Sequence, residues 1–125
     1  MTRPYVHIHH SRKVYIHQAQ LAFNLIMAGK HLFVNLSVHR PHPEKEHLLV
    51  ESMCRYGEAA RHQKGSVFVC PPLKDASSGE LVGIAIWDSE EAFQAAGPAL
   101  MKATEGDDFD SWEMEPIRGR RLKPA

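Results

Sequence analysis

The sequence predicts an α+β domain whose strands and helices follow one another in the order β-α-β-β-α-β. Three patterns carry this prediction. Residues 32–39 alternate between apolar and polar, and apolar residues recur at helical spacing between residues 49 and 60. A third apolar run, residues 80–87, is followed at once by a helix-start signal. With 125 residues, of which 43% are hydrophobic, the chain is long enough for one packed core.

The first strand is predicted at residues 32–39, because successive side chains of a strand point to opposite faces. Pro41 and Pro43 end this strand, since proline cannot donate to a β-ladder. One face of the strand carries Phe33, Asn35, Ser37 and His39, and the other carries Leu32, Val34, Leu36 and Val38.

The first helix is predicted from Pro43, which suits a first helical turn, to Gly65, which suits a helix C-terminus. Glu44 and Glu46 favour the positive N-terminal end of its dipole. Its buried stripe is expected to consist of Leu49, Met53, Tyr56 and Ala60.

The middle of the chain predicts two strands, at residues 66–70 and 80–87, separated by the loop or hairpin turn of residues 74–79. After them Asp88 is the expected N-cap of a second helix, with Glu91 three residues later. Gly97 and Pro98 are expected to break or kink this helix, with a further turn or two at residues 99–104. Its buried stripe is expected to be Ala92, Phe93 and Ala96.

The last strand is predicted at residues 110–115, with Trp112 and Met114 on one face, and the basic tail of residues 118–123 is expected to be loose. The resulting order is the split βαβ arrangement of ferredoxin-like domains.

The charges divide the chain unevenly. Residues 1–43 contain no acidic residue, whereas the remainder carries all 15 acids. We therefore interpret residues 1–26 as an N-terminal extension and residues 27–125 as the domain. The alternatives are a transit peptide or an added edge strand, at residues 5–9 or 13–17.

Composition argues against several classes of protein. No apolar run is long enough to span a bilayer, and the formal net charge of +0 argues against a nucleic-acid partner. Cys54 and Cys70 fit no metal or redox spacing and are expected to be small core residues of a cytoplasmic protein. The histidines of His7-x-His9-His10 are expected to be solvated rather than metal ligands. His39 and His42 are weak candidates for a catalytic base in a proline-flanked loop.

Three segments of the chain resemble the antibiotic biosynthesis monooxygenase family: FVNLSVHRPHPEKEHLLVESM, ELVGIAIWDSEEAFQAA and DDFDSWEMEP. The resemblance covers about residues 31–117 and implies a dimeric α+β barrel. Asn35 and Trp87 match positions that carry chemistry in the family's cofactor-free oxygenases. The haem-degrading branch uses a histidine in the second helix, and residues 90–97 contain none, so neither haem nor another cofactor or metal is expected.

Two functions are therefore considered. The first is a cofactor-independent monooxygenase that acts on a phenol or hydroquinone; the second is a non-catalytic dimeric module that binds a small ligand. Asn35 and Trp87 are the candidate catalytic residues, and Tyr56, Phe93 and Trp112 are candidates for binding the substrate. A pocket that holds Asn35 beside a titratable group favours the first function, and a sheet face filled by side chains favours the second.

A homodimer is expected through the open face of the sheet. Two helices can cover only one face of four strands, and the strands supply apolar residues to both faces. These residues are Phe33, Val34, Phe68, Cys70, Val82, Ile84 and Ile86.

Overall fold

The computed structural model describes residues 16–21, 23–24 and 31–125. Its elements are β1 (Phe33–His39), the 3₁₀-helix η1 (Pro43–Lys45), α2 (Glu46–Arg61), β2 (Ser66–Val69), β3 (Leu73–Lys74), β4 (Leu81–Trp87), α3 (Glu90–Ala103), α4 (Phe109–Trp112) and β5 (Arg118–Leu122). Residues 16–21 and 23–24 are helical, so the edge strand considered at residues 13–17 does not form at its last two positions. Residues 5–9 and the histidines of His7-x-His9-His10 lie outside the described residues.

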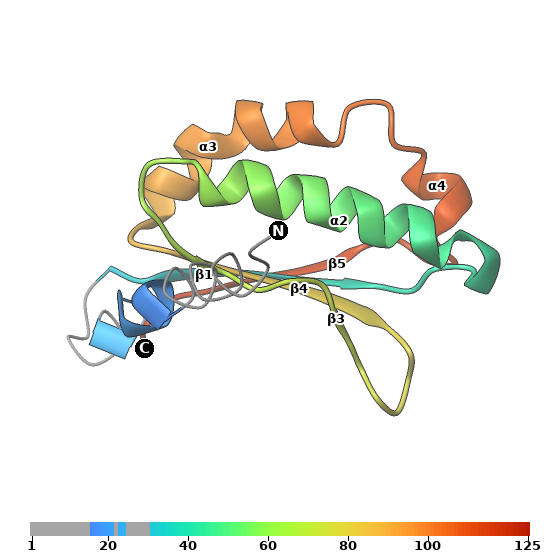
Figure 1. Ribbon diagram of the computed structural model, residues 1–125, viewed down its shortest axis with the longest axis horizontal. Coiled ribbons are helices and arrows are strands. Elements are labelled where there is room, and N and C mark those ends of the chain that lie inside the picture. The colour runs from blue at the N-terminus through green and yellow to red at the C-terminus, as the bar shows by residue number, and fades with distance from the viewer. Residues whose placement is uncertain (1–15, 22, 25–30) are drawn as a thin grey trace, which may run out of the picture.

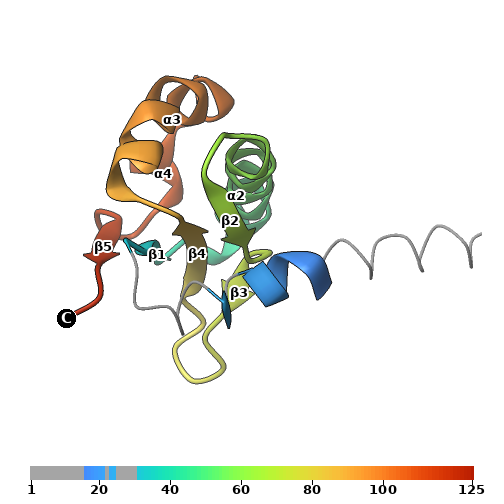
Figure 2. The same ribbon diagram turned by 90° about the vertical axis from the view of Figure 1, so that its left-hand side faces the viewer.

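The described domain has two layers, a sheet and a layer of helices on one of its faces (Figures 1 and 2). The strand order is β2-β4-β1-β5, and every pairing is antiparallel. The hairpin between β3 and β4 projects away from α2 and α3. This order confirms the predicted ferredoxin-like α+β fold.

The alternation predicted for β1 determines which of its side chains face the helices. Phe33, Asn35, Ser37 and His39 pair with Trp87, Ala85, Gly83 and Leu81 of β4, respectively. Phe33, Trp87 and Ala85 are buried in the core, so this set of alternate residues faces α2 and α3. The intervening residues, Val34, Leu36, Val82 and Ile86 among them, therefore face away from the helices and are partly exposed.

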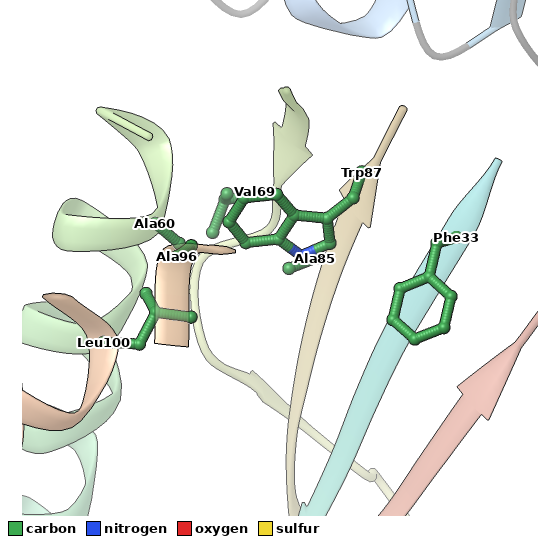
Figure 3. Close-up of a cluster of buried hydrophobic side chains, with 7 residues drawn as sticks. All are labelled: Phe33, Ala60, Val69, Ala85, Trp87, Ala96 and Leu100. Carbon is green, nitrogen blue, oxygen red and sulfur yellow. The ribbon is translucent and has the colours of Figure 1, made fainter. Parts of the chain in front are cut away.

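The core sits at the end of the sheet where β4 leads into α3. Figure 3 shows the Trp87 ring beside Val69 and Ala85. The ring lies between two helix residues, Ala60 and Ala96, and Phe33 of the neighbouring strand. Trp87 is 0% exposed, and Phe93 of α3 packs against its ring with the two ring centroids 5.8 Å apart. The small helix residues, Ala60 and Ala96, allow the helices to approach the sheet closely enough to enclose this large ring.

The C-terminus of α2 and the N-cap of α3 differ slightly from the prediction. Helix α2 ends at Arg61, and Gly65 belongs to the following turn, where its φ of 86° favours glycine. The N-cap of α3 is Ser89, whose hydroxyl accepts from the Ala92 N–H at 3.1 Å, and not Asp88.

Helix α3 runs without interruption through Gly97 and Pro98, where the sequence predicts a break or a kink; no break occurs. Pro98 is exposed, so the carbonyl that loses its helical partner can bond to water instead. The flanking residues Ala96 and Leu100, each 3% exposed, hold both halves of the helix against the core.

The predicted last strand at residues 110–115 is wrong. Residues 109–112 form the short helix α4, in which Trp112 packs edge-on against Phe109 with ring centroids 5.7 Å apart. That contact uses helical i, i+3 spacing, which a two-residue alternation of Trp112 and Met114 could not outweigh.

The tail predicted to be loose is instead the edge strand β5, in which Val34 of β1 pairs with Leu122. All five residues of β5 are exposed, and three of them are arginines. Its hydrogen bonds to β1, rather than burial of side chains, place it in the sheet. Charged edge strands of this kind discourage pairing with further strands.

Candidate functional site

A cavity of about 250 Å³ lies between the helix-facing side of the sheet and helices α2 and α4. It opens because the sheet carries small side chains here: Ser37 pairs with Gly83, and Asn35 pairs with Ala85. The lining residues from the sheet are Asn35, Ser37, His39, Val69, Cys70, Gly83, Ile84 and Ala85; the other lining residues are Ser52, Met53, Tyr56, Gly57, Pro72, Thr104, Phe109 and Ile117. The lining is largely apolar, with its polar groups concentrated on β1.

His39, the last residue of β1, is the titratable group in the cavity wall that is best fixed in position. Its Nδ1 lies 3.2 and 3.3 Å from the two carboxylate oxygens of Glu113, and its Nε2 lies 3.0 Å from Ser37 Oγ. His39 and Glu113 are each 7% exposed. Partners on both nitrogens hold the ring in one orientation.

Glu113 reaches His39 because the backbone after α4 returns to the end of β1. Pro41 forms a β-bridge with Glu113, and the Met114 N–H donates to the Arg40 carbonyl at 2.7 Å. Burial raises the pKa of Glu113 above its usual value, although the positive charge and hydrogen bond of His39 and a backbone bond from Arg40 act in the opposite direction. Glu113 thus combines burial with a direct contact to the imidazole of His39.

Asn35 and Tyr56 form a second polar pair in the cavity wall. Asn35 Nδ2 donates to the Tyr56 hydroxyl at 3.3 Å. Burial raises the pKa of Tyr56, while the charge of Arg121 and the Asn35 bond lower it by less. Tyr56 is thus a neutral phenol at physiological pH, able to donate as well as accept.

A polar network fixes the side of the cavity away from the sheet. Ser52 Oγ donates to Asp107 Oδ2 at 2.5 Å, and Arg55 Nη2 donates to Asp107 Oδ1 at 2.6 Å. These bonds tie the loop after α3 to α2. The same loop carries Thr104 and leads into Phe109, both of which line the cavity.

The structure brings together two of the five residues that the sequence proposed for the site. Asn35 and Tyr56 line the cavity, whereas Trp87 and Phe93 lie in the core cluster and Trp112 packs on Phe109 outside the lining. Trp87 Nε1 has no hydrogen-bond partner in the part of the chain that the structure describes. The cavity does hold Asn35 beside a titratable group, the arrangement that favours a catalytic role over a filled sheet face.

Sequence reasoning gave little weight to His39 and missed Ser37 and Glu113. The sequence predicts His39 at the end of the first strand and groups it with His42 beside the prolines; the structure shows that it is the last residue of β1. The alternation of β1 already placed His39 on the face of Asn35 and Ser37, so the signal for that row was present. Nothing local could identify Glu113, which is 74 residues from His39.

The remaining candidate groups lie elsewhere or are unsuited to reaction. Cys54 is exposed rather than in the core. Burial raises the pKa of Cys70, a residue of the cavity lining, and so favours the unreactive thiol form. Across residues 16–21, 23–24 and 31–125, no cluster of three metal-ligating side chains occurs. Within these same ranges, none of the helices combines the length and the hydrophobicity that a bilayer span requires.

Comparison with known proteins identifies the fold. No protein-family model and no curated protein matches the chain. Among solved structures, Rv0793 from Mycobacterium tuberculosis aligns with a TM-score of 0.66 and 17% identity, over 75% of this chain and 95% of that one. A proposed antibiotic biosynthesis monooxygenase from Nitrosomonas europaea gives a TM-score of 0.64 and 15% identity, over 75% and 90% of the two chains. SnoaB, a cofactor-independent oxygenase from Streptomyces nogalater, aligns with a TM-score of 0.58 and 17% identity, over 74% of this chain and 91% of that one.

At these low sequence identities, the structural alignments show a shared fold. The resemblance to the antibiotic biosynthesis monooxygenase family that the sequence predicted is confirmed at that level.

Proposed function

We propose that the chain is a cofactor-independent oxygenase that binds a small phenol in the cavity and removes its proton through His39. The observation that carries the proposal is the buried His39–Glu113 pair in the wall of an otherwise apolar cavity. The fold shared with SnoaB, described as a cofactor-independent oxygenase, supports the reaction class.

The size of the cavity limits the substrate. Pockets for drug-sized ligands usually measure about 300–1,000 Å³. An apolar cavity of about 150 Å³ is enough to hold benzene. A volume of about 250 Å³ therefore suits a phenol of one or two rings.

The reaction asks three things of the protein: to bind the phenol, to take its proton and to exclude water. His39 Nε2 accepts the proton once the Ser37 hydroxyl, which lies 3.0 Å from it, turns aside, and Glu113 holds the ring from behind. The Asn35 amide donates to the phenolate oxygen. The electron-rich phenolate then transfers an electron to oxygen, and the two radicals combine at the carbon para to the oxygen. Loss of water gives the quinone, so one phenol and one O₂ yield one para-quinone and one H₂O.

The test is oxygen consumption with a panel of one- and two-ring phenols and hydroquinones, with quinone formation followed by absorbance. His39→Gln should lower the rate by about 100-fold or more, the usual contribution of a general base. His62→Gln is the matched control, because His62 is exposed at the C-cap of α2, bonds to Glu58 and does not line the cavity.

Asn35→Ala should lower turnover or affinity with little change in melting temperature, since it removes a donor to the phenolate. Saturable phenol binding without oxygen uptake would refute the oxygenase and support the alternative, a non-catalytic binding module. Equal rates for wild type and His39→Gln would refute the role of His39.

A further inference from the structure

Ser37, His39 and Glu113 form a connected row that deprotonation of a phenol does not require. Ser37 Oγ lies 3.0 Å from His39 Nε2, and His39 Nδ1 lies 3.2 Å from a carboxylate oxygen of Glu113. Nucleophilic serine hydrolases use this connectivity: a hydroxyl bonded to one imidazole nitrogen, with a buried carboxylate on the other. The constellation recurs on unrelated folds and is therefore recognised by its geometry.

The hydroxyl of Ser37 can be reached by a ligand. Ser37 lines the cavity, and its partner across the sheet is Gly83, which leaves the space beside the hydroxyl open. A Cβ atom at residue 83 would lie only 2.8 Å from Ser37 Oγ. The glycine thus permits the serine conformation that reaches His39.

A hydrogen-bond donor lies on the same strand face. Asn35 is two residues before Ser37, a separation of about 7 Å along a strand. One N–H of its amide donates to the Tyr56 hydroxyl, and an amide nitrogen carries two. The second N–H can therefore donate to a carbonyl oxygen that becomes negatively charged during attack.

We propose that the cavity also catalyses acyl transfer, with Ser37 as nucleophile, His39 as general base and Glu113 as the positioning residue of His39. The substrate class is a small ester with an aromatic or short apolar group that fits about 250 Å³. The activity needs water and not oxygen, so it is independent of the proposed oxygenase function.

The proposed reaction balances in two steps. Ser37 Oγ forms a bond to the ester carbonyl carbon as its proton moves to His39 Nε2; the carbon–oxygen bond to the leaving alcohol then breaks, and the alcohol takes that proton. Water next attacks the acyl-serine, passes a proton to His39 and releases a carboxylic acid as Ser37 regains its proton. One ester and one water give one acid and one alcohol.

The first experiment treats the full chain with p-nitrophenyl acetate under nitrogen and maps the acetyl group by peptide mass spectrometry. We expect a burst of p-nitrophenolate of about one per chain and acetylation at Ser37, as acyl-enzyme accumulation predicts. A fluorophosphonate should also label Ser37, forming an oxygen–phosphorus bond and releasing fluoride. Acetylation confined to lysine or histidine side chains, with no label from the fluorophosphonate, would overturn the proposal.

Variants separate a catalytic row from a structural one. Ser37→Ala should abolish the burst and the fluorophosphonate label, while Ser111→Ala, at an exposed serine on α4, should change neither. Glu113→Gln should lower the acylation rate by at least about tenfold, because the carboxylate that orients His39 is lost. A Ser37→Ala protein that keeps the burst would refute the nucleophile.

The sharpest variant keeps all three side chains. Gly83→Ala forces the Ser37 hydroxyl to rotate away from its present position and so separates it from His39. Its matched control is Gly97→Ala, since a Cβ atom at residue 97 would contact nothing within 4 Å. We expect Gly83→Ala to lose the fluorophosphonate label while folded by circular dichroism, and Gly97→Ala to keep it. Equal labelling of the two folded variants would show that the Ser37–His39 bond does not activate the serine.

Discussion

Asp107 is expected to be the residue on which the loop over the cavity depends most. It accepts from Ser52 at 2.5 Å and from Arg55 at 2.6 Å, and these bonds join the end of α3 to α2. Ser52 is 1% exposed, so Asp107→Ala would leave a buried hydroxyl without its acceptor, which costs about 1–3 kcal/mol. The Arg55 side chain is 47% exposed, so its ion pair adds no more than about 1 kcal/mol.

The sum, about 1 to 4 kcal/mol, converts to a lower melting temperature. At about 4 °C per kcal/mol, the value between those of smaller and larger domains, Asp107→Ala should melt roughly 4–16 °C below wild type. Asp107→Asn keeps an acceptor oxygen for Ser52 and should lose less than half of that. The assay is thermal unfolding followed by circular dichroism, with urea unfolding as a second measure of stability.

A double variant tests the reason for the loss. Ser52→Ala added to Asp107→Ala removes the stranded hydroxyl and should recover part of the lost stability, since burying no polar group is better than burying an unpaired one. A fall of less than about 3 °C for Asp107→Ala, or a further large loss in the double variant, would refute this reasoning.

The remaining predictions concern a carboxyl group, an interface and two thiols. Burial raises the pKa of Glu113 above 4.5, so its contribution to stability is fully present below pH 4.5 and is lost as the pH rises through the raised pKa. The free energy of urea unfolding of wild type, minus that of Glu113→Gln, should therefore fall as the pH rises above 4.5 through the raised pKa. A difference that grows with pH would contradict the conclusion that burial raises this pKa. We expect a homodimer through the open sheet face, converted to monomer by Leu36→Asp in light scattering; wild type scattering as a 14.1 kDa monomer would contradict it. Iodoacetamide at neutral pH should modify the exposed Cys54 before Cys70, whose pKa burial raises, and the reverse order by mass spectrometry would contradict this.

The elements that the sequence predicted correctly are those with strong periodicity. The alternation predicts the extent of β1, whose residues 34–38 are half-buried on both faces. In the predicted stripe of α2, Leu49 and Ala60 are buried and Met53 and Tyr56 are half-buried, whereas the buried Ser52 and Gly57 were not predicted. The C-terminal region failed because its physics is not local. Residues 118–122 carry no apolar alternation; pairing with the edge of β1 and contacts of Arg118 and Arg121 with Glu80 and Phe93 place them in the sheet.

The candidate site was predictable in part for the same reason. Alternation placed Asn35, Ser37 and His39 on one face, and helical spacing placed Tyr56 above them. Trp87 could not be separated from a cavity residue by sequence, because a large aromatic ring at a strand end suits a core and a binding site equally well. The position of Glu113 is set by the β-bridge that it forms with Pro41, and no sequence pattern predicts this contact.

The central claim is that His39, held by Glu113, takes the proton from a phenol bound in the cavity. The most direct measurement is the absorbance spectrum of 2-naphthol bound to the protein under nitrogen, at a neutral pH where the free phenol is un-ionised. We expect the naphtholate spectrum for wild type and His62→Gln and the neutral naphthol spectrum for His39→Gln. A neutral spectrum for naphthol bound to wild type, or the naphtholate spectrum for naphthol bound to His39→Gln, would contradict it.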